Sequence, residues 1–173
     1  RADDRLVPRD DRARTTAGTP LPPLVDPSRS DHPLDLVSVR AVRTPTHRSD
    51  LRLTAGDRPL AGGTWLFSEE QPGLTGLVDL TALGWPDLER SGHTLTIAAT
   101  CTIASLLRAE PDPAWTAWPL VDRCANALLA SFKVWNAATV GGNVAVALPA
   151  GAITALLATL DAVAVVWTAD GGE

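Results

Sequence analysis

The hydrophobic and polar positions of the chain follow short alternating or helical patterns from residue 34 onward. Alternation with a period of two predicts strands. The predicted strands are 34–42, 57–67 with a glycine interruption, 76–83 with a turn at its end, and 93–100. Apolar residues that recur at spacings of three and four predict helices. The predicted helices are 46–54, 102–110, 118–132 and the Ala- and Leu-rich part of 151–167, which ends in a predicted buried strand at 162–167.

Residues 1–33 lack this patterning. They are poor in hydrophobic residues, carry charges of both signs, and contain prolines at positions 20, 22, 23, 27 and 33. Such a segment buries too little apolar surface to offset its ordering entropy, so we expect a disordered arm. The folded domain then spans 34–173. Residues 168–173 read as a hairpin tip without its returning strand, which predicts a truncated chain with an open sheet edge.

Composition excludes several classes of function. The 173 residues are 45% hydrophobic, enough for one domain or two small lobes, and the net charge is -5. An acidic chain is a poor general binder of nucleic acid or of anionic membrane surfaces. No apolar run reaches the ~18 residues that suggest a membrane-spanning helix, and no secretory signal pattern opens the chain. We therefore expect a cytoplasmic protein that does not insert into membranes. Cys101 and Cys124 have no metal-ligand spacing; they could form a structural disulfide, but two buried free thiols are the favoured interpretation.

Two segments place a glycine pair between apolar residues and a small polar residue: "LAGGTWL" at 60–66 and "ATVGGNV" at 138–144. Adjacent glycines let the backbone take positive φ angles and turn successive N–H groups toward one anion. Thr64 and Asn143 then add a directed hydrogen bond. A single glycine pair is more often a tight turn, but two such nests could close on the two phosphates of a dinucleotide. Neither segment contains G-x-G-x-x-G, so a Rossmann domain is not indicated.

The order of the segments "LAGGTWL", "LVDLTAL", "LTIAATCTIASLL", "ALLASFKVWNAATVGGNVAVALPAG" and "LLATLDAVAVV" resembles a known family. It is similar to the FAD-binding domain of molybdenum hydroxylase medium subunits, the group of xanthine dehydrogenase and aerobic carbon monoxide dehydrogenase. The resemblance runs from about residue 34 to residue 173. It implies an α+β fold of the PCMH type, with two small α/β lobes and truncated at the C-terminus.

The resemblance also implies which residues bind FAD. The first glycine segment would wrap the pyrophosphate, the second would grip the nucleotide from the other side, and 98–102 would lie along the cofactor. Among the six tryptophans, Trp65 alone lies in a glycine segment and is a candidate for stacking on a cofactor ring. The implied cofactor-binding residues are Ala61, Gly62, Gly63, Thr64, Trp65, Leu66, Leu129, Thr139, Val140, Gly141, Gly142 and Asn143.

The sequence departs from the family pattern at three positions. Ala152 stands where many members have an aspartate that contacts the polar chain of the cofactor. One lost charge-assisted hydrogen bond costs ~1.5–3 kcal/mol unless another group replaces it. Trp135 replaces a basic residue, and Ala138 replaces a glycine.

The function implied is that of an electron-transfer subunit that binds FAD. Electrons would come from the iron–sulfur clusters of a [2Fe-2S] small subunit, which receives them from a molybdopterin-containing large subunit, and would leave to NAD, a quinone or oxygen. The protein would supply position and electrostatics and no catalytic side chain. Two alternatives remain: a structural or docking subunit that has lost the cofactor, and another PCMH-type flavin oxidoreductase.

Overall fold

The structure is a computed structural model that describes residue 36 and residues 38–168. The predicted disordered arm and nearly all of the predicted hairpin tip lie outside the described residues. Short strands and short helices are both present, which makes the fold α+β, as predicted.

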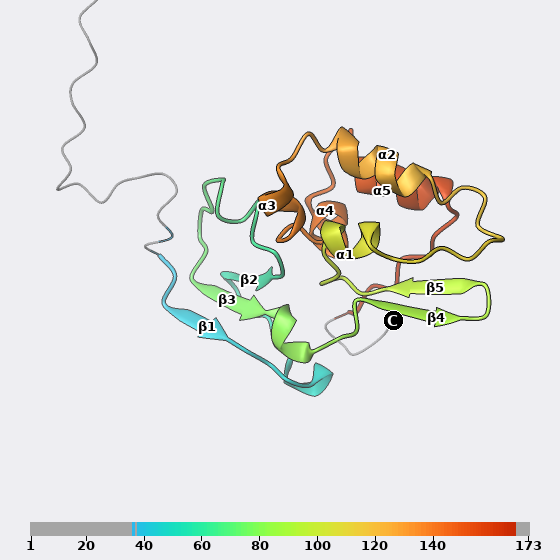
Figure 1. The fold of residues 1–173 in the computed structure, drawn as a ribbon. Coiled ribbons are helices and arrows are strands. Elements are labelled where there is room, and N and C mark those ends of the chain that lie inside the picture. Colours follow the sequence, from blue (N-terminus) through green and yellow to red (C-terminus); the bar gives the residue numbers. More distant parts are fainter. Residues whose placement is uncertain (1–35, 37, 169–173) are drawn as a thin grey trace, which may run out of the picture. The chain divides into compact units, whose positions relative to one another are not determined.

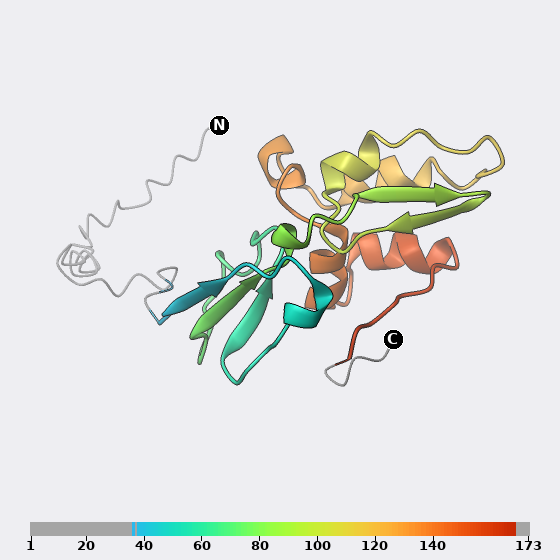
Figure 2. The same cartoon turned by 90° about the horizontal axis from the view of Figure 1, so that it is seen from below.

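A parallel sheet of three strands forms the first part of the described chain. Its strands are β1 (Ala41–Arg43), β2 (Asp57–Leu60) and β3 (Gly76–Asp79), in the order β1-β3-β2. Figure 2 shows β3 in the middle. Because β3 has a neighbour on each side, Leu77 and Val78 are buried. The strands predicted in 57–67 and 76–83 are thus confirmed over shorter spans, whereas β1 shares only residues 41 and 42 with the strand predicted at 34–42.

The predicted helix at 46–54 is only a single 3-10 turn, η1 (Arg48–Asp50). No side chain caps this turn, and a hydrogen-bonded turn that leads into β2 follows it. Asp57 accepts hydrogen bonds from the Thr54 N–H at 2.6 Å and the Thr54 hydroxyl at 2.7 Å, and it pairs with Arg43. These hydrogen bonds, those from Thr54 first, hold the pKa of the Asp57 carboxyl below its usual value. The chain therefore leaves the helical conformation after Asp50 and forms a turn at residues 54–57, so the predicted helix does not extend to residue 54.

An antiparallel hairpin follows the 3-10 turn η2 (Leu80–Leu83). Its strands are β4 (Leu88–Ser91) and β5 (Thr94–Ile97), paired from Leu88 opposite Ile97 to Ser91 opposite Thr94. The two-residue loop contains Gly92 at φ 58°, which suits a tight hairpin turn. Strand β5 confirms the strand predicted at 93–100. Strand β4 was not predicted, because "LERS" has almost no apolar alternation.

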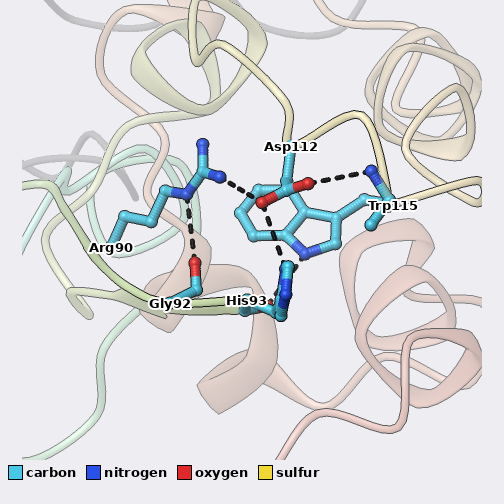
Figure 3. A network of polar contacts seen from close by, with 6 residues as sticks. Arg90, Gly92, His93, Asp112 and Trp115 are labelled. Carbon is cyan, nitrogen blue, oxygen red and sulfur yellow. Dashed lines mark hydrogen bonds and ion pairs between the residues drawn. The ribbon is translucent and has the colours of Figure 1, made fainter.

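A polar network connects this hairpin to the loop before α2 (Figure 3). The Asp112 carboxylate, with 6% of the residue exposed, pairs with Arg90 and accepts the Ala114 N–H at 2.8 Å. Nδ1 of His93 lies 3.3 Å from the same carboxylate. The Trp115 indole N–H donates to the His93 carbonyl oxygen at 2.8 Å. The network fixes the position of the hairpin tip.

Five short helices complete the described chain (Figure 1). They are α1 (Ile103–Leu107), α2 (Leu120–Ala127), α3 (Phe132–Trp135), α4 (Val140–Val146) and α5 (Ala152–Thr159). Helices α1, α2 and α5 confirm the predicted ones, and α3 and α4 were not predicted. Helices α1, α2, α4 and α5, together with Cys101 just before α1, form the core cluster of Cys101, Ile103, Leu106, Val121, Ala125, Val140, Ile153 and Leu156.

The buried strand predicted at 162–167 is wrong. This segment is neither paired in a sheet nor buried, within the part of the chain that the structure describes. Val163, Val165 and Val166 are 88%, 66% and 66% exposed. Trp167 packs edge-on against Trp85, with ring centroids 5.1 Å apart. A strand needs a neighbouring strand as well as an apolar pattern, and the described residues provide none.

Candidate functional site

The first glycine segment forms a compact turn directly after β2. Gly63 has a φ of 70°, and its carbonyl oxygen accepts the Phe67 N–H at 2.9 Å. A Cβ at Gly63 would also lie 2.4 Å from the Phe67 ring. Among the described residues, none accepts a hydrogen bond from the backbone N–H groups of residues 62–66. The turn therefore offers successive unpaired donors, as an anion-binding nest does.

Gly62 brings this turn against the segment that precedes α4. A Cβ at Gly62 would lie only 1.8 Å from the Ala137 carbonyl oxygen, so no other residue could make this approach without moving the backbone. Its φ is not positive. The two glycine segments, 60–66 and 138–144, are far apart in the sequence, yet the contact of Gly62 with Ala137 brings them to the same part of the fold.

The second glycine segment is not a nest, and this corrects the sequence prediction. Gly141 and Gly142 lie in the first turn of α4 without a positive φ. Their N–H groups already have acceptors: Gly141 donates to the Ala99 carbonyl oxygen at 3.0 Å, and Gly142 donates to Oγ1 of Thr139 at 3.0 Å. The Val140 N–H donates to the Cys101 carbonyl oxygen at 2.8 Å. The backbone N–H groups of this turn are therefore paired within the protein.

Close packing explains the second glycine pair. A Cβ at Gly141 would lie 2.6 Å from both Cβ and the carbonyl oxygen of Ala99, and a Cβ at Gly142 would lie 2.8 Å from Oγ1 of Thr139. Thr139 is buried and caps α4, and it forms an isolated antiparallel bridge with Thr102, the cap of α1. Gly141 therefore lets the start of α4 pack directly on Ala99, and Gly142 leaves room for the capping hydroxyl of Thr139.

A groove of about 770 Å³ runs along both glycine segments, within the usual range for cofactor sites. All predicted cofactor-binding residues line it except Leu129 and Val140. Val140 belongs to the buried core, and Leu129 is 94% exposed outside the groove. Ala152, where the family has an aspartate, does not line it either. The lining residues are Arg58, Pro59, Leu60, Ala61, Gly62, Gly63, Thr64, Trp65, Leu66, Gln71, Leu80, Ala99, Val134, Ala138, Thr139, Gly141, Gly142, Asn143, Ala145, Val146 and Leu148.

Two polar features of the groove point to a ligand. Oδ1 of Asn143 is buried and has no hydrogen-bond partner among the described residues. An unsatisfied buried acceptor is costly, and a ligand donor would satisfy it. Arg58 is the one ionisable side chain among the residues that line the groove. Sequence reasoning missed Arg58, although its position two residues before Leu60 on β2 places both on one face of the strand.

Other reactive groups in the described chain lie outside the groove. Cys101 is fully buried, and this burial raises the pKa of its thiol to about 12, so it stays protonated and inert near neutral pH. Both cysteines are free, as predicted. Among the described residues, no group of His, Cys, Asp and Glu is arranged to hold a metal ion. None of the helices described is long and apolar enough to cross a membrane.

The described residues form a small α+β domain with a groove lined by residues of both glycine segments. Residues 47–173 match the family model of the FAD binding domain in molybdopterin dehydrogenase. Because the match covers most of the chain, the chain belongs to this family, and FAD is its cofactor. Comparison with curated proteins gave no match, and comparison with solved structures gave none either.

Proposed function

We propose that the chain is the FAD-binding electron-transfer subunit of a molybdopterin-dependent hydroxylase or dehydrogenase related to xanthine dehydrogenase. In this proposal it has the two-lobed PCMH-type fold and works in a complex with a molybdopterin-containing subunit and a [2Fe-2S] subunit. Its place is between the iron–sulfur clusters and a final acceptor such as NAD, a quinone or oxygen. Membership of the FAD-binding family supports the proposal.

One observation carries the placement of FAD: the run of unpaired N–H groups at residues 62–66 faces the same groove as the unsatisfied Oδ1 of Asn143. Backbone donors without protein acceptors suit phosphate oxygens. A buried amide oxygen suits a hydroxyl or ring N–H. FAD contains both kinds of group, so the residues present fit this cofactor.

In this arrangement the chain's residues bind and orient. The N–H groups of residues 62–66 donate to the pyrophosphate, and the Arg58 guanidinium adds a positive charge beside them. The Asn143 side chain fixes the polar chain or ring of the cofactor, and the apolar wall of Ala99 and Val146 excludes water. FAD, when bound, supplies the electron-accepting chemistry. With Arg58 as the sole ionisable side chain of the lining, the groove itself contains no candidate for general acid or base.

The experiment is FAD binding to the purified chain, followed by absorbance after desalting and by calorimetric titration. Arg58→Gln should weaken binding about 2- to 10-fold at low salt, since a hydrogen bond to a charged group is lost from an exposed side chain. The difference should shrink as the salt concentration rises.

Arg52→Gln is the matched control. Arg52 and Arg58 are both exposed, and each donates to the carbonyl oxygen of its preceding residue, at 3.2 Å and 3.0 Å, but only Arg58 lines the groove. A wild-type chain that is folded but retains no FAD would refute the proposed function. Equal weakening by both variants would remove Arg58 from the site.

A further inference from the structure

Trp65 is a large aromatic side chain in an unusual position. It lines the groove, it is 44% exposed, and its backbone N–H belongs to the unpaired run at residues 62–66. Gly63, two residues earlier, provides the positive φ that forms the turn. The indole is therefore attached to the same short turn that presents donors to an anion.

The other five tryptophans all have a packing role. Trp85 and Trp167 contact each other edge-on, Trp115 and Trp118 stack at 5.5 Å between ring centroids, and Trp135 packs on the core cluster. Within the described residues, Trp65 has no aromatic or cationic ring partner and no place on that cluster. The partly exposed indole therefore lies beside the groove and is not engaged by another described ring or cation.

We propose that the Trp65 indole stacks on an aromatic ring of the bound cofactor. This inference rests on the proposed function, because it requires FAD in this groove. A nucleotide can contact an aromatic side chain and a phosphate-binding turn at the same time, because only a short chain separates the ring system of the nucleotide from its phosphates. Any nucleobase can stack on an aromatic side chain through its π-face, and the flavin ring has such a face too.

The stacked ring is either the adenine or the isoalloxazine of FAD. Binding of two smaller ligands, each with one of these rings, distinguishes the two cases. ADP carries the adenine and the pyrophosphate, whereas FMN carries the isoalloxazine and one phosphate. If Trp65 stacks on adenine, Trp65→Ala weakens ADP binding and leaves FMN binding unchanged. If it stacks on isoalloxazine, FMN binding weakens and the bound flavin becomes more fluorescent, because an adjacent indole quenches flavin emission.

The test is titration of the 173-residue chain and its variants with FAD, ADP and FMN. Trp65→Ala should weaken FAD binding about 5- to 150-fold, the range measured for aromatic stacking on bases. Trp65→Phe should recover most of the affinity, because a smaller ring still stacks. Phe132→Ala is the control: Phe132 is also an exposed aromatic, at 69%, but it does not line the groove.

The outcomes distinguish the two levels of the proposal. If wild type binds FAD and Trp65→Ala binds it within about 2-fold of wild type, the stacking role is refuted while the proposed function stands. If wild type binds none of the three probes, both are refuted. Should circular dichroism show that Trp65→Ala is unfolded, Trp65→Phe decides: reduced quenching of tryptophan emission by FAD supports stacking, and quenching equal to wild type refutes it.

Discussion

Replacement of Asn143 by alanine should stabilise the cofactor-free protein and weaken FAD binding at the same time. Oδ1 of Asn143 is buried in α4 without a partner among the described residues. A buried acceptor that awaits a ligand destabilises the ligand-free protein, and a hydrogen bond from the ligand relieves this destabilisation. Opposite effects on stability and affinity are therefore the signature of a binding residue.

The magnitude follows from two contributions. Alanine is favoured over asparagine in a helix interior by about 0.7 kcal/mol at most. Removal of an unsatisfied buried acceptor relieves about 1–3 kcal/mol, an upper range because the residue is only partly buried. We expect a net gain of about 1–2 kcal/mol, which corresponds to a rise in Tm of about 2–8 °C for a chain of this length. The lost hydrogen bond to FAD should weaken binding about 2- to 13-fold.

Differential scanning fluorimetry with and without FAD measures both effects in one experiment, and Asn126→Ala is its control. Asn126 also lies in a helix, α2, but it is exposed and its Nδ2 donates to the Asp122 carbonyl oxygen at 2.8 Å. Its replacement should change Tm little and leave FAD affinity unchanged. The reasoning is refuted if Asn143→Ala lowers the Tm of the cofactor-free protein, or if its FAD affinity equals that of wild type.

Three further predictions concern the supports of the groove and the hairpin. Thr139→Val removes the cap of α4 and should lower the free energy of unfolding, measured in urea, by about 0.5–2 kcal/mol. Thr139→Ser keeps the hydroxyl and should retain most of the stability. Equal losses of stability in the two variants would contradict the capping role. Gly141→Ala pushes a Cβ to 2.6 Å from Ala99 and should destabilise by about 1–3 kcal/mol; unchanged stability would contradict this packing. The Ala114 N–H, and then Arg90, holds the pKa of Asp112 below 3.8, so its stabilising effect is present above that pH and is lost as pH falls further. Asp112→Asn should lower Tm at pH 7 and flatten the acid-induced fall in Tm; parallel pH profiles would refute it.

The periodic elements could be predicted from the sequence because each has its own apolar pattern. Strands β3 and β5 and helices α1, α2 and α5 follow from alternation or helical spacing. Strand β4 has no such pattern, since it is held by its pairing with β5 and by the Asp112 network. The segment 162–167 shows the opposite case, in which the pattern is present but none of the described strands pairs with it.

Glycine is the residue type for which sequence alone was least informative. A glycine pair indicates either a positive φ or the close approach of another part of the chain to the glycine backbone, and the sequence does not distinguish the two causes. Gly63 takes a positive φ, whereas Gly62, Gly141 and Gly142 permit backbone or side-chain contacts that a Cβ would block. The contacts of Gly62 with Ala137 and of Gly141 with Ala99 join segments far apart in sequence, so only the tertiary structure reveals them. Helix α4 was missed for the same reason, because its first turn contains both glycines.

The two glycine segments therefore have different tasks, although they look alike in sequence. Because the backbone donors at the start of α4 are already paired with Ala99, Thr139 and Cys101, we do not expect this segment to bind a pyrophosphate through its backbone N–H groups. The N–H groups of residues 62–66 and the Arg58 guanidinium remain for that task. Helix α4 contributes instead a smooth wall, at Gly141 and Gly142, and one acceptor, Oδ1 of Asn143. In the proposed function, this division would orient FAD along the groove, with its phosphates on the first segment and its hydrogen-bond donors toward the second.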